Sequence, residues 1–261
     1  MCLVTGSTDG IGFEIARGLA RAGCRVVLAC RDRAKGEAAG SKIAAETGNT
    51  TLDLLLVDLS SQNSIRDAAR GFAERYHALD LLVNNAGVAL PTRQESADGI
   101  ELTWATNVLG YFLFTRSLLE PLANARFARV INMASLMAYG LDLDDVEFKR
   151  RKYDGSAAYA QSKQADRMLT WAFARRFEGT TITANAMHPG VVDTNMLRTM
   201  APGLKGRTPE EGADTAVWLA TNAKLKGVNG KFWADRKERP CEFRGVEREE
   251  ALWSLCEQMT K

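Results

Sequence analysis

Tyr159 and Lys163 are the two residues whose types and spacing most directly suggest chemistry. They are four positions apart, so within a helix both side chains lie on the same face. An isolated phenol has a pKa of about 10, and an adjacent ammonium favours its ionised form. Such a pair is suited to general acid–base catalysis near neutral pH. Tyr-x-x-x-Lys also occurs by chance on surface helices, so the interpretation depends on its surroundings.

Ser135 strengthens the acid–base hypothesis because it closely follows the apolar segment 129–133, a predicted strand. In open α/β sheets, ligands bind beyond the carboxyl ends of the strands. We therefore expect Ser135 at the sheet edge where Tyr159 would act. A role as the cap of a following helix is the alternative.

A glycine-rich turn near the N-terminus predicts a dinucleotide site. It stands between a short apolar strand, 3–4, and an amphipathic helix, 11–22. Glycine lets the backbone approach a pyrophosphate, and the helix N-terminus offers unpaired N–H groups and a partial positive charge. The residues predicted to form this phosphate-binding turn are Gly6, Ser7, Thr8, Asp9, Gly10, Ile11 and Gly12.

Arg31 follows the second predicted strand, where an acidic residue would bind the ribose hydroxyls of NAD. A cation there, with Arg33 nearby, favours the 2′-phosphate of NADP. Two alternatives stay open: Arg31 is only a solvated charge, or it stacks on adenine while Asp32 binds the ribose. Asp58, followed by Leu59, ends the third strand and is predicted to bind the adenine amino group, with a surface turn as the alternative.

Strands and helices alternate along the chain, which predicts one α/β domain over residues 1–261. We expect a doubly wound Rossmann domain with a parallel sheet of about seven strands flanked by helices. The first strand is short, either by nature or because the N-terminus has been clipped. Strands are expected at 3–4, 25–29, 52–57, 79–83, 129–133, 181–187 and 231–233. Helices are expected at 11–22, 33–47, 61–76, 101–122, 156–177, 209–222 and from about 247.

Composition and charge place limits on other functions. The chain is 46% hydrophobic and 25% charged, and its net charge of +2 is spread over interleaved acids and bases, so no nucleic-acid partner is predicted. Five cysteines without CxxC spacing indicate buried thiols in a reducing compartment. No cluster has metal-ligand spacing, so no metal site is expected. Lacking a long apolar run or a signal pattern, the protein is expected to be cytoplasmic, with no transmembrane segment.

Taken in order, the motifs resemble the short-chain dehydrogenase/reductase family, in the subgroup with Thr-Gly-x-x-x-Gly-x-Gly and Tyr-x-x-x-Lys. The resemblance covers almost the whole chain. It rests on residues 5–12, Asp58, 84–87, Asn107, Ser135, 159–163, 189–190 and Thr194. Segments 29–32 and 188–194, with the expanded interval between Ser135 and Tyr159, resemble the retinol-dehydrogenase-like branch and polyketide ketoreductases.

This resemblance implies a catalytic role for four residues. Tyr159 would protonate the carbonyl oxygen in reduction or accept the alcohol proton in oxidation, and Ser135 would hydrogen-bond that oxygen. Lys163 would tune Tyr159 and bind the nicotinamide ribose, while Asn107 would hold a water that relays protons to Lys163. For Asn107, a bridge between helix and strand backbone is the alternative.

Further cofactor contacts are also implied by the resemblance. The residues that would line the adenosine side are Asn85, Ala86 and Gly87, and those that would border the nicotinamide are Pro189, Gly190, Val192 and Thr194. Thr194 could also cap a helix beginning near Asn195. His77 and His188 have no partner at catalytic spacing and are expected to be structural.

Two loops, 136–155 and 195–208, are expected to select the substrate. Their apolar residues would either line a pocket or belong to the core: Leu136, Met137, Tyr139, Met196, Leu197, Met200 and Leu204. The basic run 149–152 lies beside acids and is predicted to pair with them on the surface. Met133 and Ala134 stand where the family often has serines, and no N-terminal membrane segment is found, so a membrane-bound lipid substrate is not favoured.

The sequence therefore predicts an NADP(H)-dependent oxidoreductase that interconverts a carbonyl and an alcohol on a medium-sized apolar small molecule. An NAD-preferring alcohol dehydrogenase is one alternative. Another is a non-catalytic dinucleotide-sensing protein of the same fold, which the complete set of Asn107, Ser135, Tyr159 and Lys163 disfavours. The resemblance leaves two states open: a homo-oligomer paired through the two long helices, as family members often are, or a chain in which the expanded loop obstructs that pairing.

Overall fold

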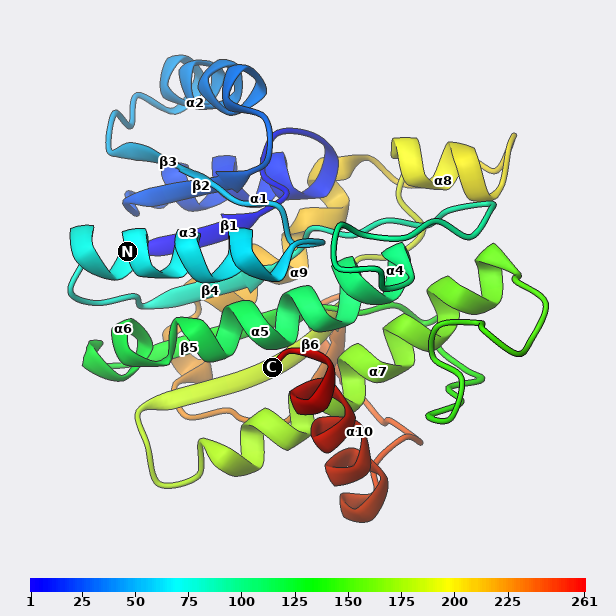
Figure 1. Ribbon diagram of the computed structural model, residues 1–261. Coiled ribbons are helices and arrows are strands. Elements are labelled where there is room, and N and C mark those ends of the chain that lie inside the picture. Colours follow the sequence, from blue (N-terminus) through cyan, green and yellow to red (C-terminus); the bar gives the residue numbers. More distant parts are fainter.

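An eight-stranded sheet crosses the protein in the order β3-β2-β1-β4-β5-β6-β7-β8 (Figure 1). The computed structural model describes residues 1–261. All neighbouring strands are parallel except β7 and β8, which form an antiparallel pair. The strands are β1 (Cys2–Thr5), β2 (Val26–Cys30), β3 (Leu52–Leu56), β4 (Leu81–Asn84), β5 (Ala128–Met133), β6 (Ile182–His188), β7 (Phe232–Ala234) and β8 (Lys237–Arg239).

The predicted single doubly wound domain is confirmed, with one strand more than the expected seven. Sequence analysis missed β8 because its three residues, Lys-Glu-Arg, are exposed and charged and follow a tight turn. The chain order reverses between β1 and β4, since β1 pairs with β2 on one side and β4 on the other. A ligand crevice is expected at the carboxyl ends of these two strands.

Helices cover both faces of the sheet (Figure 1). On one face α1, α2 and α9 pack over a core that includes Cys2 and Val4 of β1. On the other, α3, α5, α7 and α10 pack over a core that includes Leu3. Successive strand residues point to opposite faces, which explains the uninterrupted apolar runs. The helices are α1 (Gly10–Arg21), α2 (Arg33–Thr47), α3 (Gln62–Arg75), α4 (Leu102–Trp104), α5 (Gly110–Ser117), α6 (Leu119–Asn124), α7 (Gly155–Arg176), α8 (Asn195–Met200), α9 (Pro209–Thr221) and α10 (Val246–Met259).

The prediction of one continuous helix over 101–122 is wrong. After the short helix α4, the chain widens into a π-helical turn, η1 (Ala105–Leu109), before α5 begins. A second break at Leu118 separates α5 from α6. Pro121 has no N–H group to bond back into the preceding turn, which accounts for this second break. Single π turns of this kind are often found at functional sites.

The C-terminal helix α10 packs against α7 and reaches α5 through Trp253 (Figure 1). Trp253 contacts Phe112 of α5 and Phe173 of α7 edge-on, with ring centroids 4.8 Å apart in each pair. Arg175 of α7 forms ion pairs with Glu249 and Glu250 of α10. Aromatic packing and charge pairing thus fix this helix against the body of the protein.

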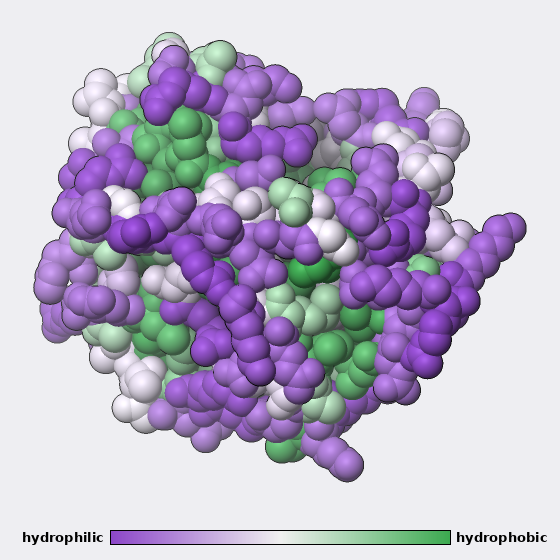
Figure 2. Space-filling model, viewed as in Figure 1, coloured by the Kyte–Doolittle hydropathy of each residue, from purple (hydrophilic) through white to green (hydrophobic).

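The surface seen in Figure 2 is mostly hydrophilic, with hydrophobic patches between charged groups. One patch lies over the edge strand β3, where Leu56 is exposed. None of the helices combines the length and apolar character needed to cross a bilayer.

Candidate active site

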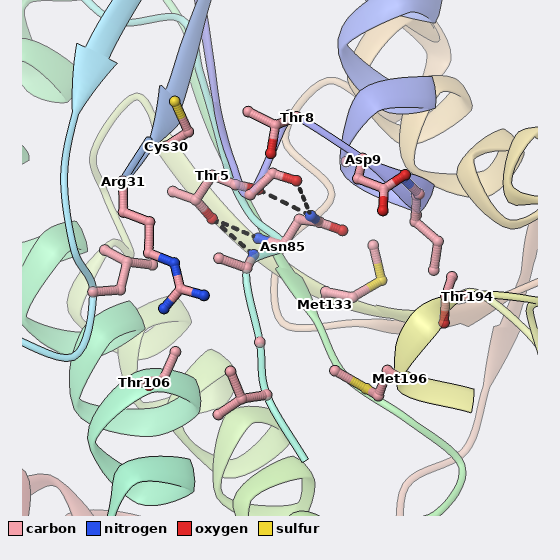
Figure 3. A pocket seen from close by; sticks show the side chains of 18 of the residues that line it. Thr5, Thr8, Asp9, Cys30, Arg31, Asn85, Thr106, Met133, Thr194 and Met196 are labelled. Carbon is pink, nitrogen blue, oxygen red and sulfur yellow. Dashed lines mark hydrogen bonds between the residues drawn. The ribbon is translucent and has the colours of Figure 1, made fainter. Parts of the chain in front are cut away.

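A cleft of about 350 Å³ opens beyond the carboxyl ends of the central strands (Figure 3). It extends from the glycine-rich turn to α7 and brings together residues from distant parts of the chain. The predicted site residues that line it are Gly6, Thr8, Asp9, Gly10, Ile11, Gly12, Arg31, Asp58, Leu59, Asn85, Ala86, Gly87, Tyr159, Lys163, Pro189 and Thr194. Five others, Ser7, Asn107, Ser135, Gly190 and Val192, do not form its wall.

The glycine-rich turn has no room for a side chain at Gly6 or Gly12. A Cβ atom at Gly12 would lie 2.1 Å from the carbonyl oxygen of Gly6, and one at Gly6 would lie 2.8 Å from the Cα of Ala86. Gly6 also has φ +64°, the left-handed region that glycine adopts readily. The result is an open backbone cradle at the N-terminus of α1, which fits the pyrophosphate of a dinucleotide.

Hydrogen bonds between β1 and β4 hold this turn in place (Figure 3). Thr5 Oγ1 accepts hydrogen bonds from the backbone N–H groups of Asn85 (2.9 Å) and Ala86 (3.0 Å). Asn85 Nδ2 donates to the Thr5 carbonyl oxygen at 2.9 Å. Asp9 caps α1 by accepting from the Gly10 N–H at 2.7 Å.

Arg31 and Asp32 have different environments at the end of β2. The exposed Arg31 side chain extends into the cleft (Figure 3). Asp32 is the N-cap of α2, where its carboxylate accepts the Lys35 N–H at 3.0 Å, and it does not line the cleft. Asp58 lines the cleft and also accepts two hydrogen bonds from Ser60, so the surface-turn role is present as well.

Lys163 is buried beneath Tyr159 on α7, with its Nζ 5.9 Å from the centroid of the Tyr159 ring. Nζ donates to the Met133 carbonyl oxygen and pairs with the Asp166 carboxylate, each at 2.8 Å. Burial is the largest single influence and lowers the pKa of Lys163, but Asp166, Tyr111 and Tyr159 together outweigh it and the pKa is raised. Lys163 therefore carries its charge at neutral pH, with one of its three donors free of these two bonds.

Ser135 lies just past β5 and is held on two sides. Its Oγ accepts the Met137 N–H at 3.0 Å, and its carbonyl oxygen accepts a hydrogen bond from the buried Arg167. Arg167 in turn stacks over Phe232, 3.9 Å from the ring centroid. No helix begins after Ser135, so the helix-cap alternative is wrong.

His188, at the end of β6, also supports this turn. Its Nδ1 accepts the Leu136 N–H at 3.3 Å. Burial, with the positive charges of Arg167 and Arg207, lowers the pKa of His188 to about 4. The imidazole is therefore neutral at neutral pH, in agreement with the structural role expected for His188.

Asn107 is buried in the η1 turn, where its side chain connects three segments. Its Oδ1 accepts the Val88 N–H at 2.9 Å, and its Nδ2 donates to the Val88 carbonyl at 3.0 Å and to Ser162 Oγ at 3.0 Å. The bridging alternative thus describes the side chain well. Sequence analysis did not identify Ser162 as its partner, and the water-holding role stays a prediction.

The segment after β6 divides into a part that faces the cleft and a part that faces away. Thr194 lines the cleft and also caps α8 by accepting the Leu197 N–H at 3.3 Å, so its helix-cap role is confirmed and its contact with the nicotinamide stays a prediction. Gly190 instead packs against the Arg207 side chain, and the buried Val192 pairs with the Arg207 backbone. Neither residue lines the cleft, and their contact with the nicotinamide stays a prediction.

A family model described as short chain dehydrogenase matches residues 1–205. The protein belongs to this family. It is therefore an NAD(P)-dependent oxidoreductase acting on CH–OH and C=O groups. Membership confirms the resemblance drawn from the sequence motifs.

The relatives of this short-chain dehydrogenase include retinol dehydrogenases. It is 38% identical to Homo sapiens retinol dehydrogenase 13 over 253 residues, which cover 91% of this chain and 76% of that protein. It is also 38% identical to Bos taurus retinol dehydrogenase 12 over 272 residues, covering 98% and 84%. These relatives confirm the retinol-dehydrogenase-like branch.

Solved structures share the fold. A crystal structure of a Mycobacterium paratuberculosis protein matches with a TM-score of 0.82 at 30% identity, covering 99% of this chain and 92% of that one. The Pseudomonas aeruginosa RhlG/NADP active-site complex matches with a TM-score of 0.73 at 30% identity, covering 88% and 92%.

The wall of the cleft in this short-chain dehydrogenase also contains residues outside the set of predicted site residues. Most of them are next to predicted motif residues in the sequence, which is the signal that could have identified them. They are Thr5, Ala29, Cys30, Val57, Ser60, Val88, Leu102, Thr106, Met133, Ala134 and Asn195.

None of the apolar residues singled out in loop 195–208 is buried, so these residues do not belong to the core. Met196 lines the cleft, and Leu204 is 54% exposed. In loop 136–155, Leu136 and Tyr139 are likewise more than half exposed, at 60% and 52%. Both loops thus present apolar side chains at the surface.

The buried Asp145 organises loop 136–155. Its carboxylate accepts the backbone N–H groups of Lys149 (2.8 Å), Arg150 (3.2 Å) and Arg151 (2.9 Å), and pairs with the Arg151 side chain. Lys149 pairs with Glu147. The prediction that the basic run 149–152 pairs with neighbouring acids is therefore confirmed for these residues.

Asp145→Asn is expected to lower the Tm at neutral pH. Burial alone would raise the pKa of Asp145, but the backbone N–H groups and Arg151 outweigh it and lower the pKa to about 2. Because the folded pKa lies below the ordinary value of 3.8, the stabilisation is present above that value and is lost as the pH falls toward 2. Thermal unfolding across pH measures this, with the exposed Asp144→Asn as control. A deficit that persisted unchanged at the lowest pH would contradict the charge-based explanation.

Proposed function

We propose that this short-chain dehydrogenase uses NADP(H) to interconvert a ketone or aldehyde and an alcohol on a medium-sized apolar substrate. The observation that carries the cofactor preference is the contrast at the end of β2. Arg31 extends into the cleft, whereas the Asp32 carboxylate is committed to capping α2. A cation there would bind a 2′-phosphate, and no carboxylate is left free to repel it.

The proposed reaction assigns proton transfer to Tyr159. When bound, the nicotinamide would supply or accept the hydride, and that chemistry is the cofactor's own. Tyr159 donates its proton to the carbonyl oxygen in reduction and accepts it back in oxidation. Lys163 stabilises the phenolate and has a donor free for the cofactor ribose. Ser135 orients the substrate oxygen with its own O–H, which stays available because Oγ only accepts from the Met137 N–H.

Apolar residues near the catalytic end of the cleft support the proposed substrate class. Leu102, Met133 and Met196 line the cleft, and Leu136 is exposed beside Ser135. A panel of aliphatic, aromatic and polyene aldehydes and ketones, including the retinal suggested by the relatives' names, tests this assignment. Higher kcat/KM for small charged carbonyls than for apolar ones would contradict it. The cytoplasmic location and the homo-oligomer stay predictions.

Arg31→Glu is expected to shift cofactor preference from NADPH to NADH. Loss of a charge-assisted contact of about 1.5–3 kcal/mol corresponds to at least about a tenfold fall in kcat/KM for NADPH. Steady-state kinetics with both cofactors measure the shift. Arg33→Glu is the matched control, because Arg33 pairs with Glu37 at 3.6 Å and does not line the cleft. Unchanged discrimination in Arg31→Glu, or NADH preference in the wild type, would favour the NAD-dependent alternative.

A further inference from the structure

We propose that Asp166 is a positioning residue: its buried carboxylate holds the Lys163 ammonium and sets the pH above which the Tyr159–Lys163 pair stops working in carbonyl reduction. This inference rests on the catalytic roles proposed for Tyr159 and Lys163. It assigns to Asp166 a function that the acid–base motif itself does not contain.

The contact between Asp166 and Lys163 is enclosed by protein. Their side chains are 0% and 4% exposed, and Asp166 Oδ2 lies 2.8 Å from Lys163 Nζ. The two residues are three apart on α7, so one turn of helix fixes their separation. With the Met133 carbonyl as the second acceptor, Nζ has a defined position beneath the Tyr159 ring.

No other charged group is close enough to replace Asp166 in this cluster. Tyr111 of α5 faces Lys163, with its ring centroid 5.1 Å from Nζ, and its hydroxyl has no hydrogen-bond partner. Cys256 of α10 is buried near Asp166, which contributes to raising the pKa of that thiol. Arg167, the next residue on α7, is directed to the Ser135 carbonyl instead. Burial raises the pKa of Asp166 to about 7 although Lys163 opposes the rise, so the carboxylate is ionised over the alkaline range in which the pair would lose its proton. Phenol and thiol groups are ordinarily neutral near pH 7, so Asp166 is the counter-ion of Lys163.

Removing the charge of Asp166 should lower the pH at which the Tyr159–Lys163 pair loses a proton. Burial favours the neutral form of Lys163, and the Asp166 carboxylate is the largest influence that opposes it. A negative charge favours the protonated form of every neighbouring group. Without it, the Tyr159–Lys163 pair releases a proton at lower pH, whichever of the two loses it first. Reduction needs both protons, so the decline of its rate with rising pH would begin at a lower pH.

Because one oxygen of Asp166 has no partner, a substitution can remove the charge without removing the contact to Lys163. Oδ1 is buried without a hydrogen-bond partner, and only Oδ2 contacts Lys163. Asp166→Asn can therefore keep an oxygen against Nζ while losing the charge. Thr170→Val is the matched control, because Thr170 is one turn along α7, buried, and bonded to the Asp166 carbonyl oxygen and to Asn132. It removes hydrogen bonds from the same helix without changing charge.

The experiment measures the rate of NADPH-dependent carbonyl reduction as a function of pH. Asp166→Asn is expected to move the alkaline limb of the profile about 1–3 pH units lower. Thr170→Val, and Asp166→Glu which retains the charge, are expected to keep the wild-type limb even where kcat falls. Should Asp166→Asn not fold, Asp166→Ser removes the same charge and is expected to give the same shift.

An unshifted limb in a folded, charge-free variant would overturn the proposal, as would an equal shift in Thr170→Val. A different experiment, on Tyr159→Phe, would contradict the proposed function itself. If Tyr159→Phe kept its activity, the acid would be elsewhere, whatever the Asp166 variants did.

Discussion

Tyr159→Phe is expected to reduce the rate of carbonyl reduction by about 10²–10⁴-fold, the usual contribution of general acid–base catalysis. Phenylalanine keeps the ring above Lys163 but has no proton to donate. The Lys163 contacts to Met133 and Asp166 do not involve the hydroxyl, so the cleft should keep its shape. NADPH should therefore still bind. Loss of NADPH absorbance measures turnover, and NADPH fluorescence measures binding.

Tyr76→Phe is the matched control for this loss. Tyr76 is buried beside Phe72 at the end of α3, with ring centroids 4.9 Å apart, and does not line the cleft. Its variant is expected to turn over at the wild-type rate. Substantial activity in Tyr159→Phe would remove Tyr159 from its proposed role, and loss of NADPH binding would point instead to a disturbed cleft.

Gly12→Ala should both destabilise the fold and weaken cofactor binding. The new Cβ would lie 2.1 Å from the Gly6 carbonyl oxygen and 2.4 Å from Asn85 Nδ2. The closer of these is a backbone atom, so the turn itself must move, at a cost of about 1–3 kcal/mol. Displacing the cradle should lower NADPH affinity at least about tenfold. Urea unfolding and fluorescence titration measure the two effects.

Gly71→Ala tests whether these effects belong to the turn. Gly71 lies within α3, and a Cβ there would meet no atom within 4 Å. The free energy of unfolding of this variant should be about 0.5–1 kcal/mol higher than that of the wild type, because alanine is the better helix former. The variant should bind NADPH normally. Equal NADPH affinity in Gly12→Ala and the wild type would mean that the turn does not hold the cofactor.

Local signals were sufficient to predict much of the fold. The helix expected at 33–47 has those bounds, because Asp32 caps its start and Gly48, at φ +71°, ends it. The helix expected at 156–177 is α7, shifted by one residue at each end. Because the topology brings motif residues that follow parallel strands to one sheet edge, most of the predicted site residues line one cleft.

Features that depend on contacts between distant segments could not be predicted in this way. The η1 turn surrounds Asn107, whose partners Val88 and Ser162 are 19 and 55 positions away. Gly190 turns from the cleft wall because Arg207, beyond α8, packs on it. The pairing of Asp166 with Lys163 is local in sequence. Its burial comes from distant elements packed around it: β5 with Met133, α5 with Tyr111 and α10 with Cys256.

The position of α10 has a consequence for self-association. Trp253 fills the space between Phe112 of α5 and Phe173 of α7, and the ion pairs to Arg175 fasten the helix there. A second copy of the chain that packed on this part of α5 and α7 would meet α10 first. The C-terminal helix thus covers Phe112 and Phe173 from within the same chain, so a neighbouring subunit could reach these two rings only if α10 moved away.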